Sequence, residues 1–230
     1  MKIFIKILIT FIIVSFKLNT VVYALNGPAV EYKITMTYLE MCETGSTASS
    51  CVNPVVLGSG DSGLIDIANT AAGAEAAQYG DTTKLKKGTV YTWIQVTLKR
   101  EATIKGVVNG CYTTASEVSD ATNTAKGSTN VADYGATTVH LAMVGSGNGN
   151  NNNSSANSDG SGAADPDIVT SGHEYLQWRG ELTNPIVVTT RLPKVEIAFG
   201  TDTALGLVRD CSSSSTGLYA SEPNVTISFQ

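Results

Sequence analysis

The sequence predicts an all-β fold, an antiparallel sandwich or barrel with long flexible loops. Three observations support this prediction. Apolar and polar residues alternate over several segments, which is the period of a strand with one buried face. Helical periodicity is almost absent from the 230 residues. Clusters of Gly, Asn, Asp and Ser separate the alternating segments and supply turns between them.

The strand predictions follow from these apolar patterns. The clearest strand lies at 30–38, where every second residue is apolar and is expected to face the core: Val30, Tyr32, Ile34, Met36 and Tyr38. The same alternation predicts strands at 90–98, 195–199 and 225–229, and shorter apolar runs predict strands at 55–57, 64–67, 103–108, 138–144, 186–190 and 205–208. The one helical candidate is the Ala-rich segment 67–78, which also fits an irregular connection.

The first 24 residues have the features of a signal peptide. Two lysines precede an apolar run at 7–16, and residues 22–24 (Val-Tyr-Ala) fit a signal peptidase site. We therefore expect cleavage after Ala24 and export to the periplasm, the cell surface or the extracellular space. The mature chain, 25–230, is then expected to form a single β-sandwich domain without a membrane span. An uncleaved membrane anchor is the alternative, although the run is shorter than the roughly 20 residues that span a bilayer.

The mature chain is predicted to be acidic. Removing the leader's three lysines from the 15 basic residues leaves 12, against 20 acidic residues, which gives a formal charge of −8. Binding to nucleic acid requires a basic stripe that neutralises phosphates, and binding to anionic lipid requires a basic cluster. The charge balance argues against both classes of partner.

Four cysteines predict two disulfide bonds, because an even number in an exported chain favours pairing. We expect Cys42 to pair with Cys51, since the Gly-, Ser- and Thr-rich segment between them fits a hairpin tip, and Cys111 to pair with Cys211 by elimination. A zinc site is the alternative. The sequence contains no Cys-x-x-Cys pair, however, and its two histidines lie elsewhere, so no metal or other cofactor is expected.

The segment 145–167 is rich in Gly, Asn and Ser, and we expect a flexible loop there because it lacks the apolar residues that would offset the entropy of ordering. Calcium binding is the alternative, with Asp159, Asp165 and Asp167 as oxygen ligands. These residues do not follow the spacing of a known calcium loop.

No catalytic residues are predicted. A Ser-His-Asp hydrolase needs a histidine beside a nucleophile, and the only candidates are His140, in an alternating apolar segment, and His173, before the next strand. The Gly-x-Ser-x-Gly motif is absent. A pair of carboxylates, as in glycosidases, would have to be brought together by the fold. We therefore expect a protein that is not an enzyme.

Four aromatic residues are candidates for stacking on a ligand. Tyr91 and Trp93 share the second face of the predicted strand 90–98, while Tyr175 and Trp178 flank a short strand. Exposed rings on a β-sandwich can stack on the apolar faces of sugars. Packing in the core is the alternative for each of them.

Two segments carry resemblances to known families. Residues 85–96 (Leu-Lys-Lys-Gly-Thr-Val-Tyr-Thr-Trp-Ile-Gln-Val) resemble a Leu-Pro-Ala-Gly-Thr-Tyr-Thr-type turn and strand of an uncharacterised family of exported bacterial proteins. In that family this strand follows an Ile-Asp-Leu or Val-Asp-Leu strand, similar to residues 64–67 here, and the order of elements is similar over 30–108. This chain lacks the Pro and has one extra residue before Tyr91. The resemblance implies an immunoglobulin-like or transthyretin-like sandwich at the cell surface and no particular activity.

The C-terminal segment 224–230 is similar to the last strand of chaperone-usher pilus subunits, where alternating apolar residues end in a penultimate aromatic residue. The resemblance implies that 30–38 acts as a donor strand for a neighbouring subunit. The close pair Cys42 and Cys51 differs from the wide pairing of those subunits.

The sequence therefore predicts an exported, non-enzymatic β-sandwich protein of the cell surface or periplasm with a structural, adhesive or ligand-binding role. A pilus subunit and a carbohydrate-binding module are the alternatives. The partners expected are a cell-surface glycan or other copies of the chain.

Overall fold

The structure is a computed structural model that describes residues 25–69, 79–116, 124–141, 153–159, 173–189, 195–208, 211 and 217–229. The predicted leader, 1–24, and residues 70–78 of the helical candidate lie outside the described residues. Within them the chain is all-β, as predicted, and its strands pair antiparallel. The immunoglobulin-like or transthyretin-like type stays a prediction.

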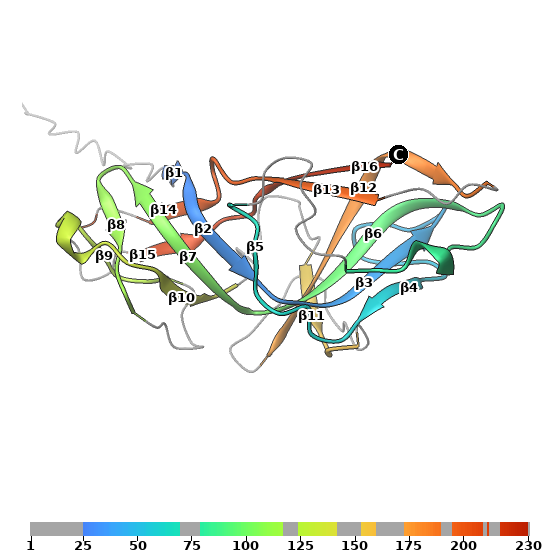
Figure 1. Ribbon diagram of the computed structural model, residues 1–230, viewed down its shortest axis with the longest axis horizontal. Coiled ribbons are helices and arrows are strands. Elements are labelled where there is room, and N and C mark those ends of the chain that lie inside the picture. The colour runs from blue at the N-terminus through green and yellow to red at the C-terminus, as the bar shows by residue number, and fades with distance from the viewer. Residues whose placement is uncertain are drawn as a thin grey trace, which may run out of the picture.

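The molecule has two lobes, which lie along its long axis in Figure 1. The first lobe contains a sheet in the order β5-β2-β7-β8-β9, in which β10 also pairs with β7, and a sheet in the order β1-β14-β15. Its strands are β1 (Leu25–Gly27), β2 (Ala29–Ile34), β5 (Ile65–Asp66), β7 (Glu101–Val108), β8 (Cys111–Thr113), β9 (Gly127–Ser128), β10 (Thr137–His140), β14 (Leu205–Val208) and β15 (Gly217–Ala220). A 3-10 helix, η2 (Val131–Asp133), precedes β10.

The second lobe contains a central sheet in the order β11-β12-β6-β3-β4 and a small sheet formed by β13 and β16. Its strands are β3 (Met36–Glu43), β4 (Val55–Ser59), β6 (Val90–Lys99), β11 (Asn153–Ala156), β12 (Tyr175–Val187), β13 (Val195–Gly200) and β16 (Asn224–Phe229). A 3-10 helix, η1 (Thr82–Lys84), follows β5 in the chain, contacts β4 and is capped by the Asp81 side chain.

Two long ribbons join the lobes. β2 continues into β3 after a break at Thr35, and β6 continues into β7 after a break at Arg100, so each ribbon leaves one sheet and enters the other (Figure 1). At the crossover the Lys99 N–H donates a hydrogen bond to the Thr35 carbonyl, 2.9 Å away. The two ribbons therefore change sheets at the same level of the molecule.

This crossover corrects the prediction for 30–38. The segment is two strands. Tyr32 and Ile34 are buried in β2, but the buried phase changes early in β3, where Thr37 is an extra residue in the ladder with β6 and Leu39 is buried. Val30, expected in the core, is 48% exposed. A single alternation cannot persist through such a bulge, because one extra residue puts the following side chains out of phase with the preceding ones.

Each lobe has its own apolar cluster of buried side chains. The first apolar cluster lies between the sheets of the first lobe and includes Tyr32, Ile104 and Leu205. The second apolar cluster lies on the face of the central sheet that β13 and β16 cover, and includes Met41 and Ile94. Met36 and Leu98, at the crossover, pack against both clusters. Burial of one such large apolar side chain contributes about 1.5 to 3 kcal/mol, so the clusters are the main source of stability.

Both predicted disulfide bonds are present. Cys42 bonds Cys51 with their Cα atoms 5.2 Å apart, and Cys111 bonds Cys211 with their Cα atoms 5.3 Å apart. The first closes the hairpin tip between β3 and β4, and the second joins β8 to the segment between β14 and β15. Both predicted pairs are confirmed, the one inferred from the hairpin tip and the one inferred by elimination.

The segment 145–167 is not wholly a loop. Residues 153–156 form β11, which pairs with β12 at the edge of the central sheet. Strand formation was not predicted because the Asn and Ser residues of β11 are poor strand formers, and pairing with an existing sheet edge supplies what the local sequence lacks. Residues 145–152 and 160–167 lie outside the described residues.

Candidate functional site

The four candidate stacking residues do not form one site. They lie on β6 and β12, which are neighbours in the central sheet, but on opposite faces of it. Tyr91 and Trp178 belong to the face of the second apolar cluster. Trp93 and Tyr175 lie on the other face, which we call the outer face.

Tyr91 is fully buried, with none of its surface exposed, so its ring is not accessible to a ligand. The ladder between β12 and β6 shifts register between Glu181 and Ile186, and Pro185, which has no N–H to donate, lies within the shift. The phase of β6 itself changes at Thr92, an extra residue in the ladder with β3, where Cys42 pairs with Trp93 and Glu43 pairs with Tyr91. Tyr91 therefore lies on the same face as Ile94, which corrects the prediction that it shares a face with Trp93. Its hydroxyl accepts a hydrogen bond from the Lys86 N–H at 3.1 Å.

Trp178 is half-buried and packs against the second apolar cluster, where its ring lies over Gly180. Its indole N–H donates a hydrogen bond to Glu222 Oε1 at 2.7 Å. This bond fastens β12 to the turn before β16. The role that the structure assigns to Trp178 is packing between sheets.

Trp93 and Tyr175 are both half-buried on the outer face but are far apart. Trp93 pairs with Glu181, and Tyr175 pairs with Lys99, which lies six residues along β6 from Trp93. At about 3.3 Å per residue the two rings stand about 20 Å apart, so they cannot stack on one sugar ring.

Polar side chains fill the outer face between these two rings. Glu40 on β3, Gln95 on β6 and Arg179 on β12 are partners in the strand registers, so they stand side by side across the sheet. Gln177 lies two residues before Arg179 on the same face. We call these four residues the polar row. Their exposed fractions are only 5%, 4%, 5% and 1% in the order Glu40, Gln95, Arg179, Gln177, so the row is as buried as an apolar core.

Hydrogen bonds connect the polar row from one side to the other. Arg179 Nε donates to Gln95 Oε1 at 2.5 Å, and Gln95 Nε2 donates to Glu40 Oε2 at 2.5 Å. Arg179 Nη2 also donates to Gln177 Oε1. The Gln95 amide thus lies between the carboxylate and the guanidinium and relays hydrogen bonding from one charge to the other.

Burial shifts the titration of both charges. Burial raises the pKa of Glu40, and the Gln95 amide and the Arg179 charge partly oppose that rise, while Asp159 adds to it. Burial also lowers the pKa of Arg179, and the Glu40 carboxylate opposes this change. Each shift favours the neutral form, as expected for charges removed from water.

The hairpin tip at 44–50 contacts the polar row from the outer side. We call this segment the strap. Arg179 Nη1 donates to the Ala48 carbonyl at 3.3 Å. Backbone bonds from the Thr47 N–H to the Ser50 carbonyl and back, and from the Glu43 N–H to the Val52 carbonyl, hold the tip closed. The Cys42–Cys51 disulfide bond joins the two ends of this hairpin.

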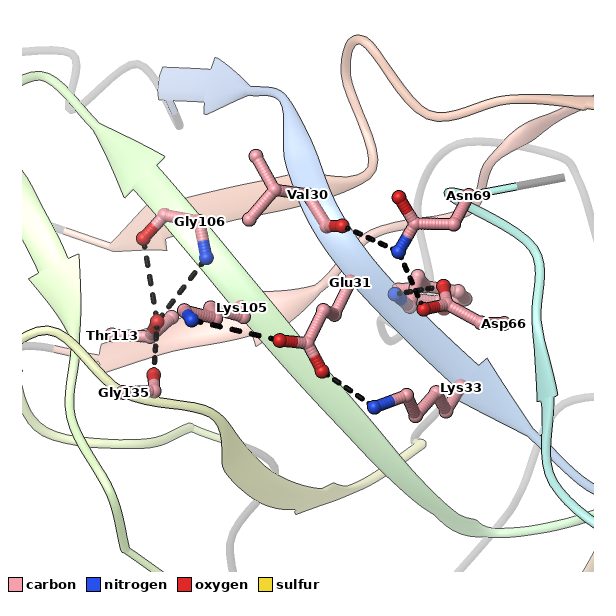
Figure 2. Close-up of polar contacts among 10 residues, drawn as sticks. Val30, Glu31, Lys33, Asp66, Asn69, Lys105, Gly106, Thr113 and Gly135 are labelled. Carbon is pink, nitrogen blue, oxygen red and sulfur yellow. Dashed lines mark hydrogen bonds and ion pairs between the residues drawn. The ribbon is translucent and has the colours of Figure 1, made fainter. Parts of the chain in front are cut away.

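A second polar region lies on the exposed face of the first lobe. Figure 2 shows Glu31 of β2 with its carboxylate between two lysines. Lys33 Nζ lies 2.6 Å from Oε2, and Lys105 Nζ of the neighbouring strand β7 lies 3.6 Å from Oε1. The hydrogen bond from Lys33 lowers the pKa of Glu31. Ion pairs of this kind hold neighbouring strands in register but contribute little to stability.

Lys105 also lies against a pair of tyrosines. Its Nζ stands 4.9 Å from the centre of the Tyr134 ring, and the rings of Tyr112 and Tyr134 meet edge to face with their centres 5.5 Å apart. All three residues are half-buried. We call them the tyrosine patch. No sequence pattern predicts this patch, because its members come from three separate segments and carry no common motif.

Figure 2 also shows how Asp66 and Asn69 stabilise a bulge in β2. The ladder between β2 and β7 shifts register between Ala29 and Glu31, which leaves Val30 as the extra residue. The Asn69 amide donates to the Val30 carbonyl at 3.2 Å and to Asp66 Oδ2 at 2.7 Å. Burial alone would raise the pKa of Asp66, but hydrogen bonds from the Asn69 amide and from backbone N–H groups outweigh it and lower that pKa.

Arg100 is a second buried arginine, 3% exposed, at the crossover between β6 and β7. Its Nε donates to the Leu141 carbonyl at 2.9 Å and its Nη1 to the His173 carbonyl at 2.8 Å. One guanidinium therefore ties together Leu141, the first residue after β10, and His173, two residues before β12. His140, half-buried, pairs with Glu101 in the ladder between β10 and β7.

Among the described residues, no group of three or more His, Cys, Asp or Glu side chains is arranged to hold a metal ion. Of the three candidate calcium ligands Asp159 is exposed, whereas Asp165 and Asp167 lie outside the described residues. No helix in the described part of the chain is long and apolar enough to cross a membrane.

Comparison of the chain with models of protein families, with curated proteins and with solved structures finds no match.

Proposed function

We propose that the chain is an exported, non-enzymatic β protein with a structural role in the periplasm or at the cell surface. The observation that carries the proposal is the set of hydrogen bonds made by the two buried arginines. Arg100 binds two backbone carbonyls from distant segments, and Arg179 binds two glutamines and the strap. Both guanidinium groups join separate parts of the chain, so these charges hold the fold together.

The two disulfide bonds support export. Disulfide bonds form and persist in oxidising compartments and are rare in the cytosol. One bond lies in each lobe. The leader predicted at 1–24 points to the same compartment.

The position of 29–43 supports a fold that is complete in one chain. β2 lies between β5 and β7, and β3 lies between β4 and β6, so both strands are paired on each side. A donor strand of the kind that the pilus-subunit alternative requires would have to leave both sheets.

Expression of the full chain in a bacterium, with a tag at the C-terminus, tests the proposal. We expect the tagged protein in the exported fraction, with a mass that begins at Leu25 and no free thiols. Retention of residues 1–24 together with four free thiols in the cytoplasm would contradict it. Size-exclusion chromatography should give a monomer, whereas ladders of SDS-resistant polymers would favour the pilus-subunit alternative.

The tyrosine patch favours a second candidate function, binding of a saccharide. It combines aromatic rings with a charged side chain that can donate hydrogen bonds to hydroxyl groups, and it lies on the exposed face of the first lobe. A panel of immobilised saccharides tests this candidate. Binding that Tyr134→Ala abolishes and Tyr134→Phe retains would support it, with Trp178→Phe, in the other lobe, as the control. Failure of all saccharides to bind leaves the structural role.

A further inference from the structure

The two disulfide bonds lie in different surroundings. Cys111 is buried in the first apolar cluster and Cys211 packs against that cluster. Gly127 lies so close to both sulfur atoms that a Cβ at that position would collide with Cys111 Sγ. Cys42 and Cys51 belong to neither apolar cluster. Each bond joins a fully buried cysteine, Cys42 or Cys111, to a partly exposed one, Cys51 or Cys211, so the bonds differ in what surrounds them. Freeing Cys111 and Cys211 therefore requires the first apolar cluster to open, whereas freeing Cys42 and Cys51 requires only the hairpin tip to move.

Opening the hairpin at Cys42 and Cys51 would uncover polar groups instead of apolar ones. The strap lies over the polar row, and its hydrogen bond to the row is the 3.3 Å contact between Ala48 and Arg179. Water can solvate the carboxylate, the guanidinium and the amides beneath it. The Thr97 hydroxyl, on the same face, is buried without a hydrogen-bond partner and would gain one from water.

We propose that Cys42–Cys51 is a redox-sensitive latch. A dithiol reductant opens this bond before it opens Cys111–Cys211, and the strap then lifts from the polar row while both apolar clusters stay packed. The outcome is a second folded state, in which Glu40 and Arg179 face water beside Trp93. The proposal concerns conformation and holds for any function of the exported protein.

The chemistry is ordinary thiol–disulfide exchange. A thiolate of the dithiol attacks the sulfur of Cys51, the more exposed residue of the pair, the bond to Cys42 breaks, and Cys42 leaves as a thiolate that takes up a proton. The second thiolate of the reductant then attacks the mixed disulfide and releases Cys51, which is protonated in turn. Two electrons pass to the protein, and the reductant becomes a disulfide.

Stepwise reduction of the native, mature protein with dithiothreitol tests the order of opening. Free thiols are blocked with N-ethylmaleimide at each time, and the blocked cysteines are located by peptide mapping. We expect Cys42 and Cys51 to be blocked about tenfold faster or more than Cys111 and Cys211. Equal rates, or faster blocking of Cys111 and Cys211, would overturn the proposal.

Tryptophan fluorescence tests the movement of the strap. Trp93 and Cys42 are direct partners across β6 and β3, and a disulfide bond beside an indole quenches its fluorescence. Trp178→Phe leaves Trp93 as the only reporter, and Trp93→Phe leaves Trp178, on the opposite face. Reduction should brighten the first variant and leave the second unchanged. A change in both would indicate general unfolding, and a change in neither would indicate that the strap stays in place.

Hydrogen exchange gives the third measurement. In Cys42→Ala/Cys51→Ala, amides of the strap should exchange faster than in the wild type, while amides of β7 should exchange at the same rate. Faster exchange in both segments would show that the bond supports the whole fold and would overturn the proposal. If the double variant fails to fold, the same comparison on wild-type protein after partial reduction decides the question.

Discussion

The two faces of the central sheet are equally buried but differ in chemistry. Ile94 and Gln95 are consecutive residues of β6, with exposed fractions of 1% and 4%. Ile94 lies in the second apolar cluster, and Gln95 lies in the polar row between Glu40 and Arg179. Low exposure alone therefore does not identify the stabilising core of this sheet.

The energetic consequences of the two faces differ. Removing apolar surface from water stabilises the fold directly. Burying the charges of the polar row costs desolvation free energy that their hydrogen bonds roughly offset. The row nevertheless opposes a slip in register, because a shift of β6 by one residue would place Gln95 in the apolar cluster and Ile94 beside Arg179. The apolar face supplies stability, and we infer that the polar face supplies specificity.

Of the substitutions that distinguish the two faces, removal of the Arg179 guanidinium should lower the free energy of unfolding most. Arg179→Met leaves Glu40 buried without its cation and should lower the free energy of unfolding by about 3 to 5 kcal/mol, measured by urea denaturation. In Glu40→Met/Arg179→Met both charges are absent, so most of the loss should be recovered. Equal losses in the single and double variants would show that the row contributes packing and not charge pairing.

Removal of a single methylene group from the apolar face of the central sheet should destabilise the fold less. Ile94→Val removes one buried methylene group from the second apolar cluster and should lower the free energy of unfolding by about 0.5 to 1.5 kcal/mol. Thermal unfolding followed by circular dichroism measures the change. A loss as large as that of Arg179→Met would mean that the cluster tolerates no repacking.

The pH dependence of stability should distinguish the faces further. Because burial raises the pKa of Glu40 above its value in the unfolded chain, its favourable contribution is complete below the unfolded pKa and is lost as the pH rises through the folded pKa. Glu40→Gln keeps the shape without titrating. The wild type should therefore lose stability relative to Glu40→Gln as the pH rises above the ordinary pKa of a glutamate, about 4.3. Parallel stability curves for the two proteins would show that Glu40, despite Arg179 and Asp159 nearby, titrates as in the unfolded chain.

The smallest effect is expected on the exposed face of the first lobe. Glu31→Gln removes the carboxylate shared by Lys33 and Lys105 and should lower the free energy of unfolding by about 0.2 to 1 kcal/mol. Salt should screen this difference, so denaturation at low and at high ionic strength measures it. A larger loss that salt does not change would place Glu31 in a structural role like that of Glu40.

The sequence by itself determined the all-β class and the disulfide pairs. Alternation with period two is a local property, and most predicted segments, including 90–98 and 103–108, lie on strands of the structure. The close spacing of Cys42 and Cys51 left one pairing for the other two cysteines. Both inferences succeed because they need only neighbours in the chain.

Tertiary structure decided what each face of a strand meets. Alternation shows that two faces differ, but the change of phase after Met36 depends on a bulge at Thr37, and the burial of Tyr91 depends on a bulge at Thr92. Both bulges lie in the ladder between β3 and β6. The polar row joins residues 40, 95 and 179, which only the order of strands β3-β6-β12 brings into contact. Hydrogen bonds and burial act over a few ångströms in space, so residues this distant in the chain reveal their partners only when the sheet is assembled.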